Sequence, residues 1–346
     1  MRRTSWAVLV LVCAAAVMTL AAVPAPQGTG YHLLKKVTLG GEGGWDYLSA
    51  DPVSHRVFLS RGTHIMVVDA DGKVVGDIPN LKGTHGAQLV PDLGRGFSSN
   101  GQSNSVTIFD LKTLATISEV NLPAANGPDG FMYDPSSKRV FVFNGRSHDA
   151  TAIDAKTGQV VGTVKAEGDG EQAVIADDLI YVNIEDTNEV VVFDPKSLEV
   201  KERFPIGVAK TPTGLAYDAK TKRLFIGCRN EPKMVVMDAA TGKVINSYPI
   251  GAGVDFAGFD PDTHLIFFSC GDGTLSIYHE KSADVYEDAG AVKTQPSAKT
   301  MAFDPKTKKI FLPAAEILEG PPAQPGGRPT RTQKPGTFVV LVVGKS

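Results

Sequence analysis

The chain has 346 residues, of which 42% are hydrophobic and 21% are charged, and its formal net charge is −3. This composition is typical of a soluble globular protein. A mildly acidic chain does not provide the basic surface that nucleic-acid binding requires, so that class of function is disfavoured.

Residues 1–25 have the pattern of a secretory signal peptide. Arg2 and Arg3 precede a largely apolar run, and small residues at Ala22 and Ala25 offer cleavage positions. The apolar run is shorter than the ~20 residues that span a bilayer, although an uncleaved anchor helix remains the alternative. We therefore expect a periplasmic or secreted chain with no membrane span after cleavage.

Before the first repeat unit, residues 32–39 form a predicted strand that has no partner nearby in the sequence. The last unit ends with a strand at 338–343 and lacks a fourth strand. We expect the segment 32–39 to be the outer strand of that last unit, because joining the two chain ends removes two open sheet edges.

An acidic turn residue recurs at near-constant spacing along the rest of the chain. Successive members are 41 to 44 residues apart, and they are Asp51, Asp92, Asp134, Asp177, Asp218, Asp260 and Asp304. A period of this size is typical of propeller blades with four strands each. We interpret each Asp as structural, because Asp accepts hydrogen bonds from the turn backbone that follows it.

The third unit shows the expected strands most clearly. A short strand ends at Asp134, and further strands are predicted at 139–144, 149–154 and 159–164. No segment after residue 30 has the helical period of about 3.6 residues, so we expect almost no helix. The sequence therefore predicts an all-β fold, a single seven-bladed β-propeller of four-stranded antiparallel blades over residues 31–346.

A Pro- and Gly-rich insertion, residues 317–336, interrupts the seventh unit between its second and third strands. Its composition predicts a long exposed loop with no regular element. Two roles are open for it: a flexible insertion without function, or a lid or docking loop over the channel mouth.

Polar residues that differ between the units mark the face where first strands begin and second strands end. In a propeller these positions surround one mouth of the central channel, and varied polar groups around a cavity are typical of a ligand site. Hydrogen bonding with neighbouring loops and channel water is the alternative role. The candidate ligand-binding residues are Trp45, Asp46, His85, Asp129, Asn144, Gln172, Asn183, Asp255 and Lys299.

Within this set, His85 is the single histidine and the candidate catalytic base. Asp46, Asp129 and Asp255 are candidate ligands of a divalent metal such as calcium, and His85 with Asp46 and Asp129 is the alternative ligand set. Lys299 is expected to form an ion pair with Asp255 or Asp46. A hydrogen-bonded, purely structural role for His85 is the alternative.

Cys228 and Cys270 are the cysteines that remain after signal cleavage. They occupy the same register in adjacent blades, which diverge from the axis. We therefore expect two buried thiols rather than a disulfide.

Three segments carry a resemblance to a known family, namely Asp134–Asn144, Asp154–Val161 and Asp304–Phe311. With these motifs, the chain resembles the YVTN/YncE-like seven-bladed propeller family of exported bacterial proteins over residues 31–346. The Tyr-Val-Thr-Asn signature is degenerate here, nearest in Tyr181–Ile184. The resemblance implies a binding or surface protein, and related propellers include lactonases and dehydrogenases.

The sequence leads to two main hypotheses of function. The first is an exported, monomeric binding or scaffold protein whose channel mouth binds a small molecule, a glycan or a peptide. The alternative is a metal-dependent lactonase-type hydrolase at the same mouth, with the three aspartates as metal ligands and His85 as base. Binding of single-stranded nucleic acid is a third hypothesis, but it requires aromatic side chains on a basic groove.

Overall fold

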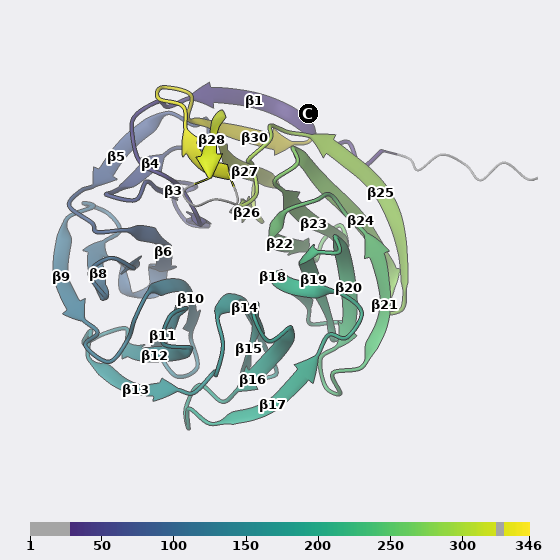
Figure 1. Ribbon diagram of the computed structural model, residues 1–346, viewed down its shortest axis with the longest axis horizontal. Coiled ribbons are helices and arrows are strands. Elements are labelled where there is room, and N and C mark those ends of the chain that lie inside the picture. Colours follow the sequence, from purple (N-terminus) through teal and green to yellow (C-terminus); the bar gives the residue numbers. More distant parts are fainter. Residues whose placement is uncertain (1–27, 323–328) are drawn as a thin grey trace, which may run out of the picture.

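The computed structural model describes residues 28–322 and 329–346. These residues form seven four-stranded antiparallel sheets and one two-stranded sheet. The seven sheets surround a central axis, with the first strand of each sheet innermost (Figure 1). The predicted seven-bladed β-propeller is thereby confirmed. The predicted signal peptide, residues 1–25, lies outside the described residues.

Blades 1 to 3 follow one another along the chain. Blade 1 contains β2 (Leu48–Ala50), β3 (Val57–Ser60), β4 (Ile65–Val68) and β5 (Val74–Ile78). Blade 2 contains β6 (Thr84–Val90), β7 (Arg95–Asn100), β8 (Ser105–Asp110) and β9 (Thr116–Asn121). Blade 3 contains β10 (Pro128–Asp134), β11 (Arg139–Asn144), β12 (Asp149–Asp154) and β13 (Val160–Val164).

Blades 4 to 6 repeat this order. Blade 4 contains β14 (Gly170–Ala176), β15 (Leu179–Ile184), β16 (Glu189–Phe193) and β17 (Val200–Pro205). Blade 5 contains β18 (Lys210–Asp218), β19 (Arg223–Asn230), β20 (Lys233–Asp238) and β21 (Val244–Pro249). Blade 6 contains β22 (Val254–Asp260), β23 (Leu265–Cys270), β24 (Thr274–Ser282) and β25 (Val285–Lys293).

Blade 7 joins the two ends of the chain. Its strand order is β26 (Ala302–Asp304), β27 (Lys309–Ala314), β30 (Val339–Gly344) and β1 (His32–Thr38). Strand β1 runs antiparallel to β30 and lies at the outer edge of the ring beside it (Figure 1). The predicted closure by the N-terminal strand is therefore confirmed, and β30 is protected on both edges.

Helix is nearly absent from the described ranges. The single 3-10 turn there is η1 (Pro91–Leu93), and no described helix is long and apolar enough to cross a bilayer. This agrees with the expectation of almost no helix.

The hydrophobic core is divided among the interfaces between blades. Seven clusters of buried side chains are present, and each joins two neighbouring blades. The cluster between blades 1 and 2, for example, includes Phe58 and Phe109, whose rings stack 6.0 Å apart. Each blade is apolar on both faces because it is sandwiched between two others. Few apolar side chains are therefore left to line the mouth.

The insertion in blade 7 differs from its prediction. Residues in β28 (Ile317–Pro322) and β29 (Pro329–Gln333) pair as an antiparallel hairpin, so the expectation of no regular element was wrong. Both strands are edge strands of a two-stranded ribbon, where a proline that lacks an N–H donor is tolerated. The hairpin leaves blade 7 after β27, on the face where second strands end.

The repeated aspartates stabilise the turns between first and second strands, as predicted, in five of the seven units. Their side chains accept backbone N–H bonds from their own turn, as Asp134 does from Ser137 at 2.7 Å; the five are Asp51, Asp134, Asp218, Asp260 and Asp304. Asp92 instead lies in η1, and Asp177 pairs with Lys222 of the next blade. These turns all lie on the face opposite the channel mouth.

The same turns also connect adjacent blades. Four positions after the Asp, a residue with φ between 55° and 58° recurs in five units, at His55, Lys138, Lys222, His264 and Lys308. Four of these side chains reach back to the acidic turn of the preceding blade. Lys308, for example, contacts Asp260 at 2.7 Å, and Lys222 contacts Asp177 at 2.8 Å.

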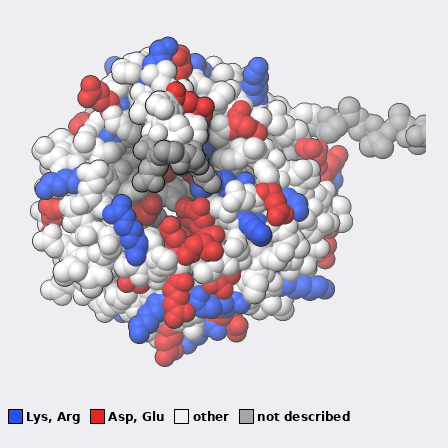
Figure 2. Space-filling model, in the orientation of Figure 1, with Lys and Arg blue, Asp and Glu red and all other residues white. Residues whose placement is uncertain are grey.

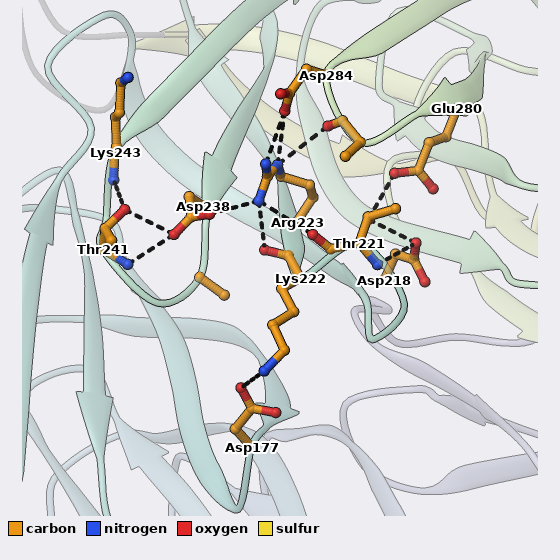
Figure 3. Close-up of polar contacts among 12 residues, drawn as sticks. Asp177, Asp218, Thr221, Lys222, Arg223, Asp238, Thr241, Lys243, Glu280 and Asp284 are labelled. Carbon is orange, nitrogen blue, oxygen red and sulfur yellow. Dashed lines mark hydrogen bonds and ion pairs between the residues drawn. The ribbon is translucent and has the colours of Figure 1, made fainter.

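The residue that follows this left-handed position contacts the following blade instead of the preceding one. Arg223 donates to Asp284 and to the carbonyl of Ala283 in blade 6, while its neighbour Lys222 points to Asp177 in blade 4 (Figure 3). Arg139 likewise donates to the carbonyl of Pro195 in the following blade. The ring is thus held together by polar contacts on this face, which leaves the mouth face free to vary.

Candidate functional site

The channel mouth is a hollow on the face where first strands begin. Acidic side chains gather around it (Figure 2). A cavity of about 470 Å³ lies there, lined by loops of blades 1 to 4. Its charged and aromatic lining residues are Trp45, Asp46, His85, Asp129, Arg146 and Asp169.

Glycine residues keep the cavity open. At Gly101 an added Cβ would lie 2.9 Å from Nε2 of His85, and at Gly145 it would lie 2.4 Å from Oδ1 of Asp169. Any larger residue at these positions would displace the polar side chains of the mouth. The glycines therefore decide how closely those side chains approach the strand ends.

Polar side chains of successive blades are linked around the mouth, beginning in blade 3. His85 of blade 2 places Nδ1 3.2 Å from Asp129 of blade 3 and 2.9 Å from Asp46, which precedes β2 in blade 1. Asp46 in turn lies 3.7 Å from Nζ of Lys299, which precedes β26 in blade 7. Two carboxylates and a lysine from three other blades thus converge around one imidazole.

The links continue from Lys299 around the other side of the mouth. Lys299 contacts Asp255 of blade 6, and Asp255 also contacts Arg229 of blade 5. Arg229 then pairs with Glu185 of blade 4 at 3.1 Å. Burial alone lowers the pKa of Lys299, but the charges of Asp255 and Asp46 outweigh this effect, and the pKa is raised. The expected ion pairs of Lys299 are therefore both present.

In the described ranges, the series of ionic contacts that runs from Lys299 to Glu185 does not continue from Glu171 or Asp169 of blade 4 to Asp129 of blade 3. Glu171 of blade 4 accepts a hydrogen bond from the Tyr47 hydroxyl at 2.6 Å and shares a hydrogen bond with Glu185. Asp169 of the same blade and Asp129 of blade 3 line the cavity beside them. Among the described residues, His148 of blade 3 lies 3.6 Å from Asp186 of blade 4, but Asp129, Asp169 and Glu171 form no ion pair across this gap.

The pKa values of the carboxyl groups at the gap are raised by burial and by neighbouring acidic groups. Burial raises the pKa of Asp129 to about 7, and the charge of Asp46 adds to the effect. Burial and the hydrogen bond with Glu185 hold the pKa of Glu171 well above its ordinary value. The pKa of Asp169 is also raised, by burial and by the charge of Glu185. The charged forms of these groups are therefore poorly compensated.

Three of the predicted ligand-binding residues form hydrogen bonds with the scaffold. The Asn144 amide donates to Asp149 at 2.7 Å and to Thr151 at 3.0 Å within its own blade. The Asn183 amide donates to the Gly214 carbonyl at 2.9 Å in the next blade. Both asparagine side chains are buried and do not line the mouth cavity.

Gln172 has a similar structural role deeper in the channel. Its amide oxygen accepts from the backbone N–H groups of Leu215 and Ala257, both at 2.9 Å, and its nitrogen donates to the Ala257 carbonyl. It thereby links blades 4, 5 and 6. Trp45 does line the mouth cavity, and its ring packs against Phe338 at 5.4 Å.

The candidate ligand-binding set omits Glu171, Glu185 and Arg229, which the structure places at the mouth. Glu171 is adjacent to the selected Gln172, and Glu185 is two residues beyond the selected Asn183. Successive side chains of a strand point to opposite sides, so an error of one position changes the environment completely. The signal that could have found them is their charge, because a charged group in a partly enclosed site requires a hydrogen-bond or ionic partner.

Of the two predicted metal-ligand sets, the structure brings together the one that includes His85. Asp255 is engaged by Arg229 and Lys299 and does not join Asp46 and Asp129. The group of described side chains with metal-binding spacing is Asp46, His85 and Asp129. A hydrolase with three aspartate ligands and His85 as a separate base therefore does not match this arrangement.

The two cysteines are free and buried, as predicted. Cys228 packs in the cluster between blades 4 and 5, whereas Cys270 packs in the cluster between blades 5 and 6. Burial raises the pKa of each thiol to about 12. Neither thiol is available to the mouth.

The fold and this mouth define the chain as a seven-bladed β-propeller with a charged channel mouth. No protein-family model matches the sequence, and no curated protein sequence matches it. A chain in a crystal structure of the mitotic checkpoint complex is similar in fold, with a TM-score of 0.71 and 14% identity over 94% of this chain and 98% of that one.

A chain of Kuenenia stuttgartiensis hydrazine synthase is also similar, with a TM-score of 0.68 and 14% identity. The alignment covers 85% of this chain and 96% of that chain. At such low identity, both similarities concern the propeller fold alone.

Proposed function

We propose that this protein is an exported binding propeller that holds a positively charged ligand in its channel mouth. The ligand carries an ammonium or guanidinium group, either as a free small molecule or on a peptide side chain. The single observation behind the proposal is that, in the part of the chain that the structure describes, Asp129, Asp169 and Glu171 form no ion pair across the boundary between blades 3 and 4. There, Asp129 of blade 3 and Asp169 of blade 4 line a shared cavity, and Arg146, which lines it too, forms no ion pair with either of them among the described residues.

The charge balance of the mouth supports a cationic ligand. Six carboxyl groups surround it, on Asp46, Asp129, Asp169, Glu171, Glu185 and Asp255. The permanently charged bases beside them are Arg146, Arg229 and Lys299. A ligand with one or two positive charges reduces this excess of negative charge in a partly enclosed site, where Coulombic attraction is stronger than in bulk water.

Trp45 favours an organic cation as the ligand. Trp45 lines the same cavity as Asp129 and Asp169. An aromatic face beside carboxylates attracts ammonium and guanidinium groups through cation–π interactions, which add about 0.5–2 kcal/mol. A glycan, which carries neither charge, does not use the carboxylates in this way.

The experiment is a calorimetric titration in EDTA with Nα-acetyl-arginine methylamide and with its citrulline analogue. The arginine compound is expected to bind with a dissociation constant that rises with salt, and the neutral citrulline compound is expected to bind much more weakly. An arginine-containing tripeptide, compared with the free compound, distinguishes a peptide ligand from a small molecule.

The matched variants for this titration are Asp129→Asn at the gap and Asp177→Asn on the opposite face. Asp129→Asn is expected to weaken arginine binding about tenfold, the equivalent of roughly 1.4 kcal/mol, while Asp177→Asn leaves it unchanged. Equal binding of the citrulline compound, or unchanged binding by Asp129→Asn, would refute the proposal.

Two further features of the proposal come from the sequence alone. We propose that residues 1–25 direct export to the periplasm or the cell exterior. We also propose membership of the YVTN/YncE-like family, on the motifs Asp134–Asn144 and Asp304–Phe311. Mass spectrometry of the protein recovered from its native compartment tests the first point, because a cleaved chain begins after Ala22 or Ala25.

A further inference from the structure

Three potential ligand atoms from successive blades meet at one point in the mouth. Nδ1 of His85 lies 2.9 Å from Oδ2 of Asp46 and 3.2 Å from Oδ1 of Asp129. One ligand atom from each residue lies within 4.8 Å of the others. The three residues come from blades 1, 2 and 3, so the packing of these successive blades fixes their separation.

Hydrogen bonding within this group leaves one oxygen unpaired. Nδ1 of His85 is hydrogen-bonded with Asp46. Oδ1 of Asp129 is buried and, within the described part of the chain, has no hydrogen-bond partner despite its closeness to the same nitrogen. A buried carboxylate oxygen without a donor is costly, and one imidazole N–H cannot serve two carboxylates equally well. A cation placed among the three atoms would satisfy both carboxylates at once.

The separations agree with the geometry of a small divalent cation. With bond lengths of about 2.0–2.2 Å to nitrogen and oxygen, ligand atoms around such an ion are roughly 3–3.5 Å apart. The two distances from Nδ1 are close to this range. The remaining coordination positions would face the mouth cavity of about 470 Å³, which has room for water or a ligand group.

The donor set indicates which metal is preferred. One imidazole nitrogen and two carboxylate oxygens suit first-row transition metals such as zinc and manganese, whereas calcium takes oxygen ligands almost exclusively. We propose that Asp46, His85 and Asp129 bind one divalent transition-metal ion, with zinc favoured over manganese. This proposal does not rest on the organic cation proposed above, and because both would use Asp129 the two are tested in separate titrations.

Contacts behind the ligands hold this geometry. The backbone N–H of Asp46 donates to the Ser60 hydroxyl at 2.8 Å, and its carbonyl accepts from the Thr300 hydroxyl at 2.6 Å. The missing side chain at Gly101 leaves room for the His85 ring. Such supporting contacts orient the ligands of protein metal sites.

Zinc titration of the full chain, freed of metal with a chelator, tests the site. We expect one zinc ion per chain by calorimetry. His85→Ala and Asp129→Asn are each expected to weaken zinc binding roughly 100-fold or more, because each removes a direct ligand. The matched control is His148→Ala, which removes an exposed histidine that lies 3.6 Å from Asp186 outside the group.

A cobalt spectrum provides a readout that does not depend on the folding of the variants. Co²⁺ bound by one nitrogen and two oxygens in a low-coordinate site is expected to absorb visible light several-fold more strongly than the hydrated ion. A spectrum identical to that of hydrated Co²⁺, or zinc binding that is unchanged in the correctly folded variants, would overturn the proposal. Because the arginine titration is performed in EDTA, failure of the metal site leaves its result unaffected.

Discussion

Lys222 and Arg223 are adjacent in the chain, yet their side chains hold two different neighbouring blades. Lys222 pairs with Asp177 of blade 4, and Arg223 donates to Asp284 and Ala283 of blade 6 (Figure 3). The left-handed backbone at Lys222, with φ of 56°, separates the two directions. Through these two residues, the turn of blade 5 is connected to blades 4 and 6.

These two contacts should differ in their effect on stability. Arg223 is mostly buried and makes several hydrogen bonds, whereas Lys222 is exposed and makes one ion pair. Arg223→Met is expected to lower the free energy of unfolding by about 1–3 kcal/mol, because charged hydrogen bonds are lost from a partly buried site. Lys222→Met is expected to have a much smaller effect. Urea unfolding of both variants measures the difference, and equal losses would contradict it.

Removal of the closing strand should destabilise the whole ring. Deletion of residues 31–39 leaves β30 without its outer partner and exposes its backbone along one edge. A fall in melting temperature of roughly 10 °C or more is expected, which corresponds to several kcal/mol in a chain of this size. Addition of a synthetic peptide of residues 31–39 should restore part of the loss. A truncated chain that melts like the intact one would contradict the closure.

Glu280 should make stability depend on pH. It accepts a hydrogen bond from Thr221 at 2.8 Å, close to Asp218, Tyr286 and His264. Burial, and then the charge of Asp218, raises its pKa from 4.5 to about 7. The folded chain therefore binds this proton more tightly than the unfolded chain, so the contribution of Glu280 to stability is lost as the pH rises through 7.

Glu280→Gln tests this dependence because it removes the titrating group and keeps a hydrogen-bond acceptor. Relative to the natural chain, the variant is expected to gain in free energy of unfolding between pH 5 and pH 8. Urea unfolding at several pH values measures the gain. Glu287→Gln, which alters an exposed residue paired with Lys281, is the control, and parallel profiles for all three proteins would exclude the effect.

The two buried thiols should be unreactive in the folded protein. Both Cys228 and Cys270 are fully buried, and their pKa values are about 12 because of burial. Only the thiolate is nucleophilic, so Ellman's reagent is expected to react slowly with the native chain and rapidly in denaturant. Rapid reaction of the native protein would show that an interface between blades opens readily.

Gly101 should control the position of His85. Gly101→Ala places a Cβ 2.9 Å from Nε2 of His85, whereas an added Cβ at Gly44 of the same cavity meets no atom within 4 Å. Gly101→Ala is expected to weaken zinc binding about tenfold with little change in melting temperature, and Gly44→Ala is expected to preserve it. Calorimetry on both variants makes the comparison, and equal zinc affinities would contradict a role for this glycine.

Much of the fold follows from the sequence because its signals are local. The period of the aspartates, the apolar strands on both sides of each turn and the short hairpins involve residues close in the chain. Asp134, for example, is bonded by Ser137, three residues away. Even the closure by β1 could be predicted. The N-terminal strand has no partner nearby in the sequence, and the last blade lacks its fourth strand, so pairing the two satisfies both.

The mouth was decided only by the tertiary structure. Lys299 meets Asp46 across the junction of the last and first blades, and His85 meets Asp129 across another interface. These contacts depend on the exact register and tilt of each blade, which no local pattern contains. For the same reason the sequence favoured Gln172 over the adjacent Glu171. Successive side chains of a strand point to opposite sides. The amide of Gln172 is therefore bonded to the backbone of neighbouring blades, whereas the carboxyl group of the adjacent Glu171 lies at the mouth.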